Sequence, residues 1–129
     1  MRENYSDSKY AVQLLDPQTI SGDGSEHDGS WVDLKNFRDG VLLVSAGAID
    51  AATTVTIQCQ TAEDDSGTGA ADVLSADQSF TNTGANAVHA YELKNLKRYV
   101  RIQYKVTNAK NALIGAVVVG WNRFQVPAS

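Results

Sequence analysis

Side chains that perform acid–base or metal chemistry are few in this chain and lie far apart. There are 2 histidines and 1 cysteine. His27 lies in the polar run 25–28, whose residue types match a catalytic triad, but triad members normally converge from separate elements of a fold. His89 lies on the same side of a strand-like segment as Tyr91 and Leu93, which favours a packing role over a catalytic one. The sequence therefore predicts no catalytic site and no enzyme.

Two acidic, glycine-containing loops offer oxygen ligands that suit a hard cation such as Ca²⁺. Neither loop has the spacing of an EF-hand, and we expect solvated loops with no metal and no cofactor. The glycines of the first loop also lack the strand-to-helix setting of a nucleotide-binding motif. The carboxylates concerned are Asp23, Glu26 and Asp28 in the first loop and Glu63, Asp64 and Asp65 in the second.

Composition narrows the function classes further. The chain has 129 residues and a formal net charge of −4, with a pI near 5.0. An acidic chain is a poor ligand for a phosphate backbone, so we expect no nucleic-acid partner. No apolar run is long enough to span a membrane, and residues 1–10 have no signal-like apolar core. Cys59 lies on the same strand face as Val55 and Ile57, which predicts a buried, inert thiol. A single cysteine cannot form an internal disulfide, which fits a reducing compartment.

The elements that would position any site are short strands. Residues 53–61 alternate cleanly, with Val55, Ile57 and Cys59 inward and a polar outer face. Further strands are predicted at about 19–21, 30–34, 72–74, 78–81 and 88–93.

Two segments are apolar on both faces. Residues 41–48 predict a strand in the middle of a sheet. Residues 112–121 follow the turn 108–111, which comes after a strand at 98–106 with one solvent-exposed face. We interpret the last two as an antiparallel hairpin. A strand with two apolar faces needs a second covering layer, such as a loop or a neighbouring subunit.

Roughly seven to nine strands without an amphipathic helix predict an all-β protein, an antiparallel β-sandwich or jelly roll. Residues 1–15 show no strict period, so we expect an extended N-terminal arm there, followed after a turn at Asp16-Pro17 by a single sandwich domain at 16–129.

Two surface features suggest partner contacts. Five basic residues gather around the strand at 98–106, where they either protect a wet edge strand or form a patch for an acidic protein surface. They are Lys94, Lys97, Arg98, Arg101 and Lys105. The aromatics Trp31, Tyr91 and Trp121 could stack on sugar rings, although large aromatics in sandwiches more often lie in the core.

The succession of segments resembles small virion proteins of tailed bacteriophages, especially head decoration or cement proteins. The resemblance covers about residues 30–124. The segments that carry it are Trp31-Val32-Asp33-Leu34-Lys35, the apolar strand at 41–48, Ile57-Gln58-Cys59-Gln60-Thr61-Ala62-Glu63-Asp64, Asn95-Leu96-Lys97-Arg98-Tyr99-Val100-Arg101-Ile102 and Val117-Val118-Val119-Gly120-Trp121.

The resemblance implies a structural protein on the outer surface of a phage capsid, made in the bacterial host cytoplasm. It would bind the major capsid protein, stabilise the shell and form a homo-oligomer, with a trimer favoured. On location and composition, the candidate contact residues are Tyr5, Lys9 and Tyr10 in the arm and Arg98, Arg101 and Lys105 in the basic strand. The alternatives are a carbohydrate-binding sandwich module and another minor tail or fibre protein.

Overall fold

The computed structural model describes residues 9–35, 37–81 and 87–121, and these form strands without a helix. The all-β prediction is confirmed. The strands are β1 (Lys9–Ser21), β2 (Glu26–Asp28), β3 (Val32–Asp33), β4 (Asp39–Ile49), β5 (Thr54–Ala62), β6 (Ala71–Asp72), β7 (Gln78–Thr81), β8 (Ala87–Leu93), β9 (Tyr99–Val106) and β10 (Asn111–Trp121). No helix in the described residues is long and apolar enough to cross a membrane.

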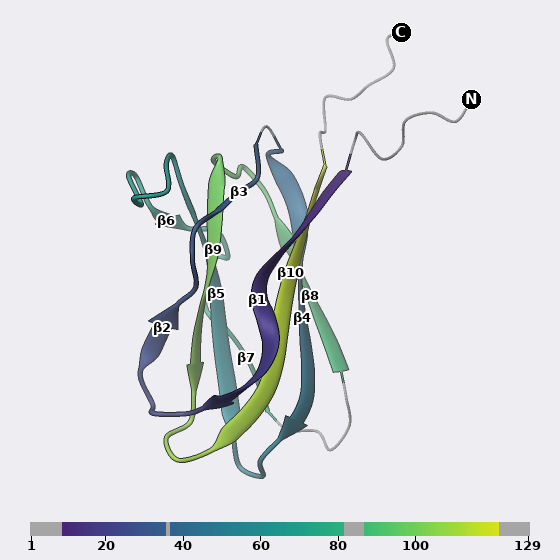
Figure 1. Ribbon diagram of the computed structural model, residues 1–129, viewed down its shortest axis with the longest axis vertical. Helices are drawn as coiled ribbons and strands as arrows, with labels where there is room; N and C mark the ends of the chain where they lie inside the picture. Colours follow the sequence, from purple (N-terminus) through teal and green to yellow (C-terminus); the bar gives the residue numbers. More distant parts are fainter. Residues whose placement is uncertain (1–8, 36, 82–86, 122–129) are drawn as a thin grey trace, which may run out of the picture.

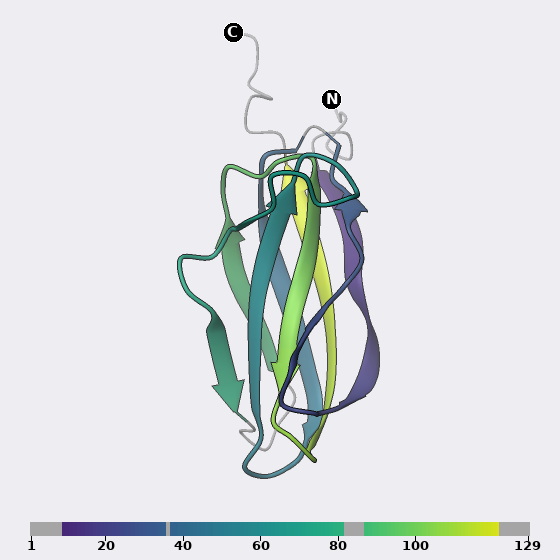
Figure 2. The same cartoon turned by 90° about the vertical axis from the view of Figure 1, so that its left-hand side faces the viewer.

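The strands form two antiparallel sheets packed face to face (Figures 1 and 2). The 4-stranded sheet has the order β1-β10-β4-β8. The 6-stranded sheet has the order β2-β9-β5-β6, with β3 also paired to β9 and β7 to β5. The doubly apolar strand β4 lies between β10 and β8, as the sequence predicts for a strand in the middle of a sheet.

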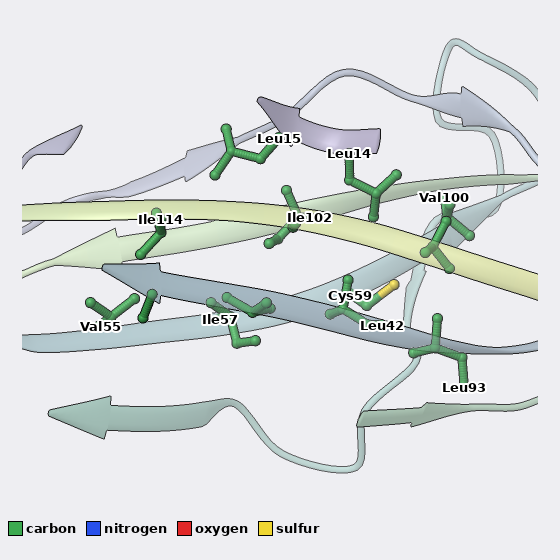
Figure 3. Packing of buried hydrophobic residues seen from close by; sticks show 14 of the residues in the cluster. Leu14, Leu15, Leu42, Val55, Ile57, Cys59, Leu93, Val100, Ile102 and Ile114 are labelled. Carbon is green, nitrogen blue, oxygen red and sulfur yellow. The ribbon is translucent and has the colours of Figure 1, made fainter. Parts of the chain in front are cut away.

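The core fills the space between the two sheets. Alternate side chains of four long strands point into it, because successive residues of a strand face opposite sides. Leu42 on β4 and Val118 on β10 meet Ile57 on β5 and Ile102 on β9, and all four are at most 1% exposed. Figure 3 shows this packing, with Cys59 among the aliphatic side chains. The sequence prediction of a buried thiol is confirmed.

Chain connections at one end cross from one sheet to the other. The links β1–β2, β4–β5 and β9–β10 each join strands of different sheets, and all three lie at the lower end of Figure 1. The last two are bonded together. Asp50 N–H donates to the carbonyl of Asn111 at 3.0 Å, and Thr54 N–H donates to the hydroxyl of Thr107 at 2.8 Å.

The first link packs tightly against the third. Gly22 N–H donates to the carbonyl of Lys110 at 2.7 Å, and Ala109 N–H donates to the carbonyl of Gly22 at 2.9 Å. A Cβ at Gly22 would collide with the carbonyl of Thr107, so only glycine fits this approach. These contacts hold the two sheets at a fixed distance at this end.

The predicted hairpin at 98–121 is wrong. Both strands and the turn exist, but β9 pairs with β5 and β2, whereas β10 pairs with β1 and β4. The connection passes from one sheet to the other, because each strand supplies an apolar inner face and the two faces bury each other in the core. A turn signal marks where the chain reverses and does not specify which strands pair.

The predicted arm is wrong for residues 9–15. They belong to β1, which pairs with β10 from Lys9↔Trp121 to Ser21↔Asn111. The predicted turn at Asp16-Pro17 is part of this strand, where two register shifts accommodate it. Residues 1–8 lie outside the described residues. The expected loop at 22–29 also contains the short strand β2.

Candidate interaction surface

The outer face of the 4-stranded sheet is mostly apolar. Rows of paired residues cross all four strands, such as Gln13–Val117–Leu43–Ala90. We call this surface the apolar face. It consists of Ala11, Gln13 and Thr19 on β1; Leu113, Gly115, Val117 and Val119 on β10; Val41, Leu43 and Ser45 on β4; and Val88, Ala90 and Glu92 on β8.

The apolar face contains a single charged residue, Glu92, whose carboxylate lies 3.6 Å from the ammonium of Lys94. Its most exposed large apolar side chain is Val88, at 65%. No described element covers this sheet on its outer side, which is the right-hand side of Figure 1. An uncovered apolar surface of this kind is typical of an interaction site.

A shallow hollow of about 260 Å³ opens on the same face. It forms because Gly115 has no side chain and Ser45 has a small one, and it lies between Pro17 on one side and Val88 on the other. The hydroxyl of Ser45 donates to the carbonyl of Gly115 at 3.5 Å, within the sheet. Because no charged or titratable group among the described residues lines the hollow, it suits an apolar side chain better than a reaction.

The outer face of the 6-stranded sheet is polar, and its side chains bond to one another. We call it the polar face. It comprises Thr56, Gln58 and Gln60 on β5, Arg101, Gln103 and Lys105 on β9, and Asp28 on β2. The Gln103 amide donates to Asp28 at 2.7 Å, and the Gln60 amide donates to Asp72 at 2.8 Å.

Gln58 lies on the polar face yet is only 2% exposed, because the segment between β6 and β7 covers it. Its amide donates to the Leu74 carbonyl at 3.2 Å and to Asp77 at 3.0 Å. Its carbonyl accepts from the backbone N–H of Leu74 and of Cys59. One side chain thus fixes the covering segment to β5.

Arg101 is the centre of the polar face. Its guanidinium donates twice to the Gln60 carbonyl, at 3.0 and 2.8 Å, and lies 3.4 Å from the Asp28 carboxylate. It also lies 4.4 Å from the centre of the Trp31 ring, a cation–π contact. Its charge and hydrogen-bonding capacity are largely used within the protein.

Arg98 precedes β9 and binds the Asp33 carboxylate through two hydrogen bonds of 2.9 and 2.8 Å. This bond to Arg98 lowers the pKa of Asp33 from 3.8 to about 2. Lys105 is exposed and makes no ion pair within the described part of the chain. Of the three basic contact candidates, Lys105 alone has no ion pair there, and Glu26 is its register partner on β2.

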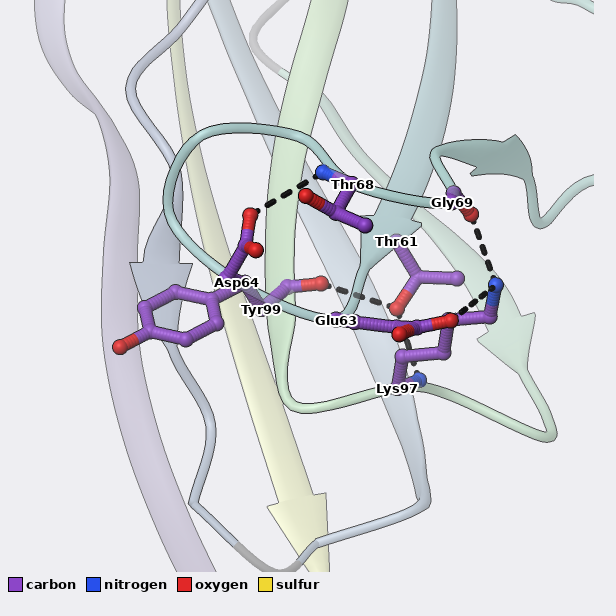
Figure 4. Close-up of polar contacts among 7 residues, drawn as sticks. All are labelled: Thr61, Glu63, Asp64, Thr68, Gly69, Lys97 and Tyr99. Atoms are coloured by element: carbon purple, nitrogen blue, oxygen red, sulfur yellow. Dashed lines mark hydrogen bonds and ion pairs between the residues drawn. The ribbon is translucent and has the colours of Figure 1, made fainter.

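The acidic loop after β5 is held by its own backbone (Figure 4). Asp64 accepts from the N–H groups of Ser66 and Thr68, and the bonds to Thr68 lead the causes that lower its pKa. The ammonium of Lys97 donates to the Gly69 carbonyl at 2.7 Å and lies 3.9 Å from Glu63. Within the described residues, no His, Cys, Asp and Glu side chains gather in a group that could hold a metal ion.

The histidines take packing positions at opposite margins of the sandwich. His89 stacks on Phe80 with ring centres 4.1 Å apart. His27 stacks on Tyr104 at 5.8 Å and bonds to Asp23 at 2.8 Å. Burial raises the pKa of the Cys59 thiol to about 12, which leaves it protonated. These groups do not converge on a reaction centre.

The three candidate aromatics do not form one platform. Trp31 lies beside Arg101 on the polar side, Tyr91 packs against the core, and Trp121 pairs with Asp39 at the end of β10. A sugar-binding site built from these rings is therefore not present.

The predicted arm candidates are only partly described. Lys9 and Tyr10 are paired through their backbones with Trp121 and Gly120, and Tyr5 lies outside the described residues. The sequence assignment of contacts omitted the apolar face altogether. Its signal was present in the doubly apolar strands, which predicted a covering layer without identifying the residues that would touch it.

The fold resembles that of proteins in virus and subviral particles. The chain matches a crystal structure of the infectious bursal disease virus VP2 subviral particle with a TM-score of 0.61 and 8% identity, over 92% of this chain and 34% of that one. For the Gx strain of that virus the TM-score is 0.55 with 12% identity, over 92% and 34%. For its T=1 particles the TM-score is 0.57 with 13% identity, over 88% and 31%.

At these identities the likeness shows a shared fold, and the chain spans about a third of the length of the proteins it matches. It agrees with the predicted β-sandwich or jelly roll. No protein-family model matches the sequence, and no curated protein matches it.

Proposed function

We propose that this chain is a non-enzymatic structural protein of a virus particle, which binds the outer surface of a bacteriophage capsid and stabilises the shell. The observation that carries the proposal is the apolar face, a nearly uncharged sheet surface that no described element covers. The capsid proteins that share the fold support a place in a virion. The bacteriophage setting and the decoration role rest on the resemblance of the sequence segments.

In this proposal the major capsid protein packs on the apolar face. Leu43 and Val117 lie side by side at the middle of that face, and the hollow beside Val88 accepts a projecting apolar side chain of the shell. The core covers the inner faces of β4 and β10, and in this proposal the shell covers their outer faces. This accounts for two strands that are apolar on both sides. Many weak contacts of this kind reinforce one another on a shell with repeated sites.

The polar face then points away from the shell. Its side chains are bonded to one another, so a partner there would have to replace existing hydrogen bonds and ion pairs. For the same reason, we rank Arg98 and Arg101 below the apolar face as contacts, and Lys105 joins them because it lies on the polar face. We retain Lys9, Tyr10 and Tyr5 as candidates for the rim of the interface.

The test is co-sedimentation of the purified protein with a panel of empty tailed-phage heads. We expect the wild-type chain to pellet with at least one of them and Val117→Asp to lose at least tenfold in binding, because a buried carboxylate would lack a partner. The matched control is Thr56→Asp, at a central strand of the polar face, which should bind like the wild type.

Equal binding by wild type and Val117→Asp would contradict a contact through the apolar face. A chain that pellets with no head but assembles into particles by itself would instead favour a shell-building subunit. That second candidate is suggested by the matched proteins, which come from a subviral particle and T=1 particles.

A further inference from the structure

The margins of the two sheets are protected to very different degrees. An unpaired strand edge invites pairing with another chain, and proteins block such edges with short strands, proline, bulges or charge. In the 6-stranded sheet the marginal strands are short, at 3 residues for β2, 2 for β3, 2 for β6 and 4 for β7. In the 4-stranded sheet, β1 carries Pro17 and two register shifts.

Of these protections, β8 has only the charge of Glu92. It is 7 residues long, contains no proline, and keeps an unbroken register with β4 from Ala46↔Ala87 to Gly40↔Leu93. Within the described residues, no strand pairs with its other edge (Figure 1). Its outward side chains are Val88, Ala90 and Glu92, and Val88 is 65% exposed. This edge is long, regular and apolar, which is the geometry of a pairing site.

We propose that β8 pairs antiparallel with β8 of a second copy, about a two-fold axis that passes through Ala90. Ala90 is the middle residue of Ala87–Leu93, so this register pairs every residue of the strand. The two 4-stranded sheets then form one continuous sheet with a shared apolar face.

The sequence of β8 is complementary to itself in this register. On the outer side Glu92 lies opposite Val88 of the second copy, so the two carboxylates do not face each other, and a small alanine occupies the axis. On the inner side His89 lies opposite Tyr91 of the second copy. The two-fold axis repeats each of these pairings on both sides of Ala90. A strand of another sequence would not have this symmetry, and we therefore propose a second copy as the partner.

The inference rests on the edge of β8 and does not depend on the proposed shell binding. It predicts two chains, whereas the resemblance to decoration proteins implies three. Because edge pairing buries little surface, we expect a dimer that dissociates on dilution.

The decisive experiment is native mass by light scattering over a concentration series, with charge variants at the axis. The wild-type chain should reach the mass of two chains. Ala90→Glu alone and Ala90→Lys alone should each stay at the mass of one chain, because like charges meet at the axis. An equimolar mixture of the two variants should regain the mass of two chains, since Glu then faces Lys.

The matched control is Ala11→Glu, an exposed alanine on the opposite margin of the same face, which should dimerise like the wild type. Circular dichroism and thermal unfolding of each variant establish that the chain is folded. A wild-type chain that stays monomeric, a mass of three chains, or a dimer unaffected by Ala90→Glu would each overturn the proposal.

A cysteine at the axis tests the register itself. Directly paired Cα atoms in antiparallel strands lie about 4.5–5.5 Å apart, within the range a disulfide spans. Ala90→Cys should therefore cross-link to itself under mild oxidation, whereas Ala87→Cys should not, because it faces Leu93 of the second copy. Cys59 is buried and does not compete. Because no shell is present, a negative result would overturn the pairing and leave binding through the apolar face to be judged by co-sedimentation.

Discussion

The two sheets share one core but present opposite outer faces to water. On the polar face, Arg101, Gln60 and Asp28 bind one another, and even the buried Gln58 has four hydrogen bonds. On the apolar face, Leu43 and its neighbours have no covering layer within the described chain. The comparison indicates that changes on the polar face should affect folding of the single chain, whereas changes on the apolar face should affect association.

The largest expected effect separates neighbouring leucines on β4. Leu42 is 0% exposed in the core and Leu43 lies on the apolar face. Leu42→Ala should lower the free energy of unfolding by about 2–5 kcal/mol, through lost burial and a cavity. Leu43→Ala should lower it by about 1 kcal/mol or less, because water already reaches that side chain. Urea denaturation of the dilute protein measures both; equal losses would mean that the apolar face is covered within one chain.

The second effect concerns Gln58. Gln58→Ala should lower the free energy of unfolding by about 1–3 kcal/mol, because backbone groups of Leu74 and Cys59 lose their partner. The control is Gln13→Ala on the apolar face, where we expect a change within about 0.5 kcal/mol. Similar losses in both variants, measured by urea denaturation, would contradict the view that the polar face is the self-bonded one.

The third effect concerns Arg101. Arg101→Met keeps most of the side-chain length but removes the cation–π contact with Trp31 and the bonds to Gln60. We expect a loss of about 1–2 kcal/mol and faster quenching of tryptophan fluorescence by acrylamide, because Trp31 becomes more accessible. Lys105→Met, on the same strand and face, should leave both measurements unchanged. Unchanged quenching in the arginine variant would argue that Trp31 is shielded by something else.

The smallest effect depends on pH. The pKa of Asp33 is about 2 in the folded protein, below the ordinary value of 3.8 that applies to the unfolded chain. Its bond to Arg98 therefore stabilises the fold fully above pH 3.8, and this contribution is lost as the pH falls toward 2. Asp33→Asn should therefore lower Tm slightly near neutral pH, and the difference from wild type should vanish near pH 2. Because the pair is exposed, added salt should reduce the difference as well. A difference that grows in acid would have the wrong sign.

The sequence predicts the inner halves of the strands well. The alternation of Val55, Ile57 and Cys59 is a local signal, and all three lie in the core of β5. The same holds for β8, where His89, Tyr91 and Leu93 share the inner side and the register with β4 is unbroken. By contrast, the double leucine Leu14-Leu15 and Pro17 break the period of β1, so a strand with two bulges resembled an arm.

Pairing and covering were not predictable from local patterns. The turn between β9 and β10 does not reveal that its strands join different sheets, because that choice depends on the positions of β4 and β5. The burial of Gln58 depends on residues 73–77, which cross over it from the far side of an acidic loop. The self-bonding of Arg98 and Arg101 likewise needs Asp33 and Asp28, more than sixty residues away in the sequence. Positive charge in a sequence therefore overstated what the folded surface offers to a partner.

The pairing of β1 with β10 has a consequence for the order of events in synthesis. Lys9, at the start of the first described strand, must wait for Trp121 at the end of the last one, and the three sheet-crossing links bond only after both members of each contact exist. Such distant pairings make folding slow compared with helical proteins of this size. The ribosome must therefore release β10 before β1 can pair with it, and a nascent chain that ends before Asn111 cannot form the 4-stranded sheet.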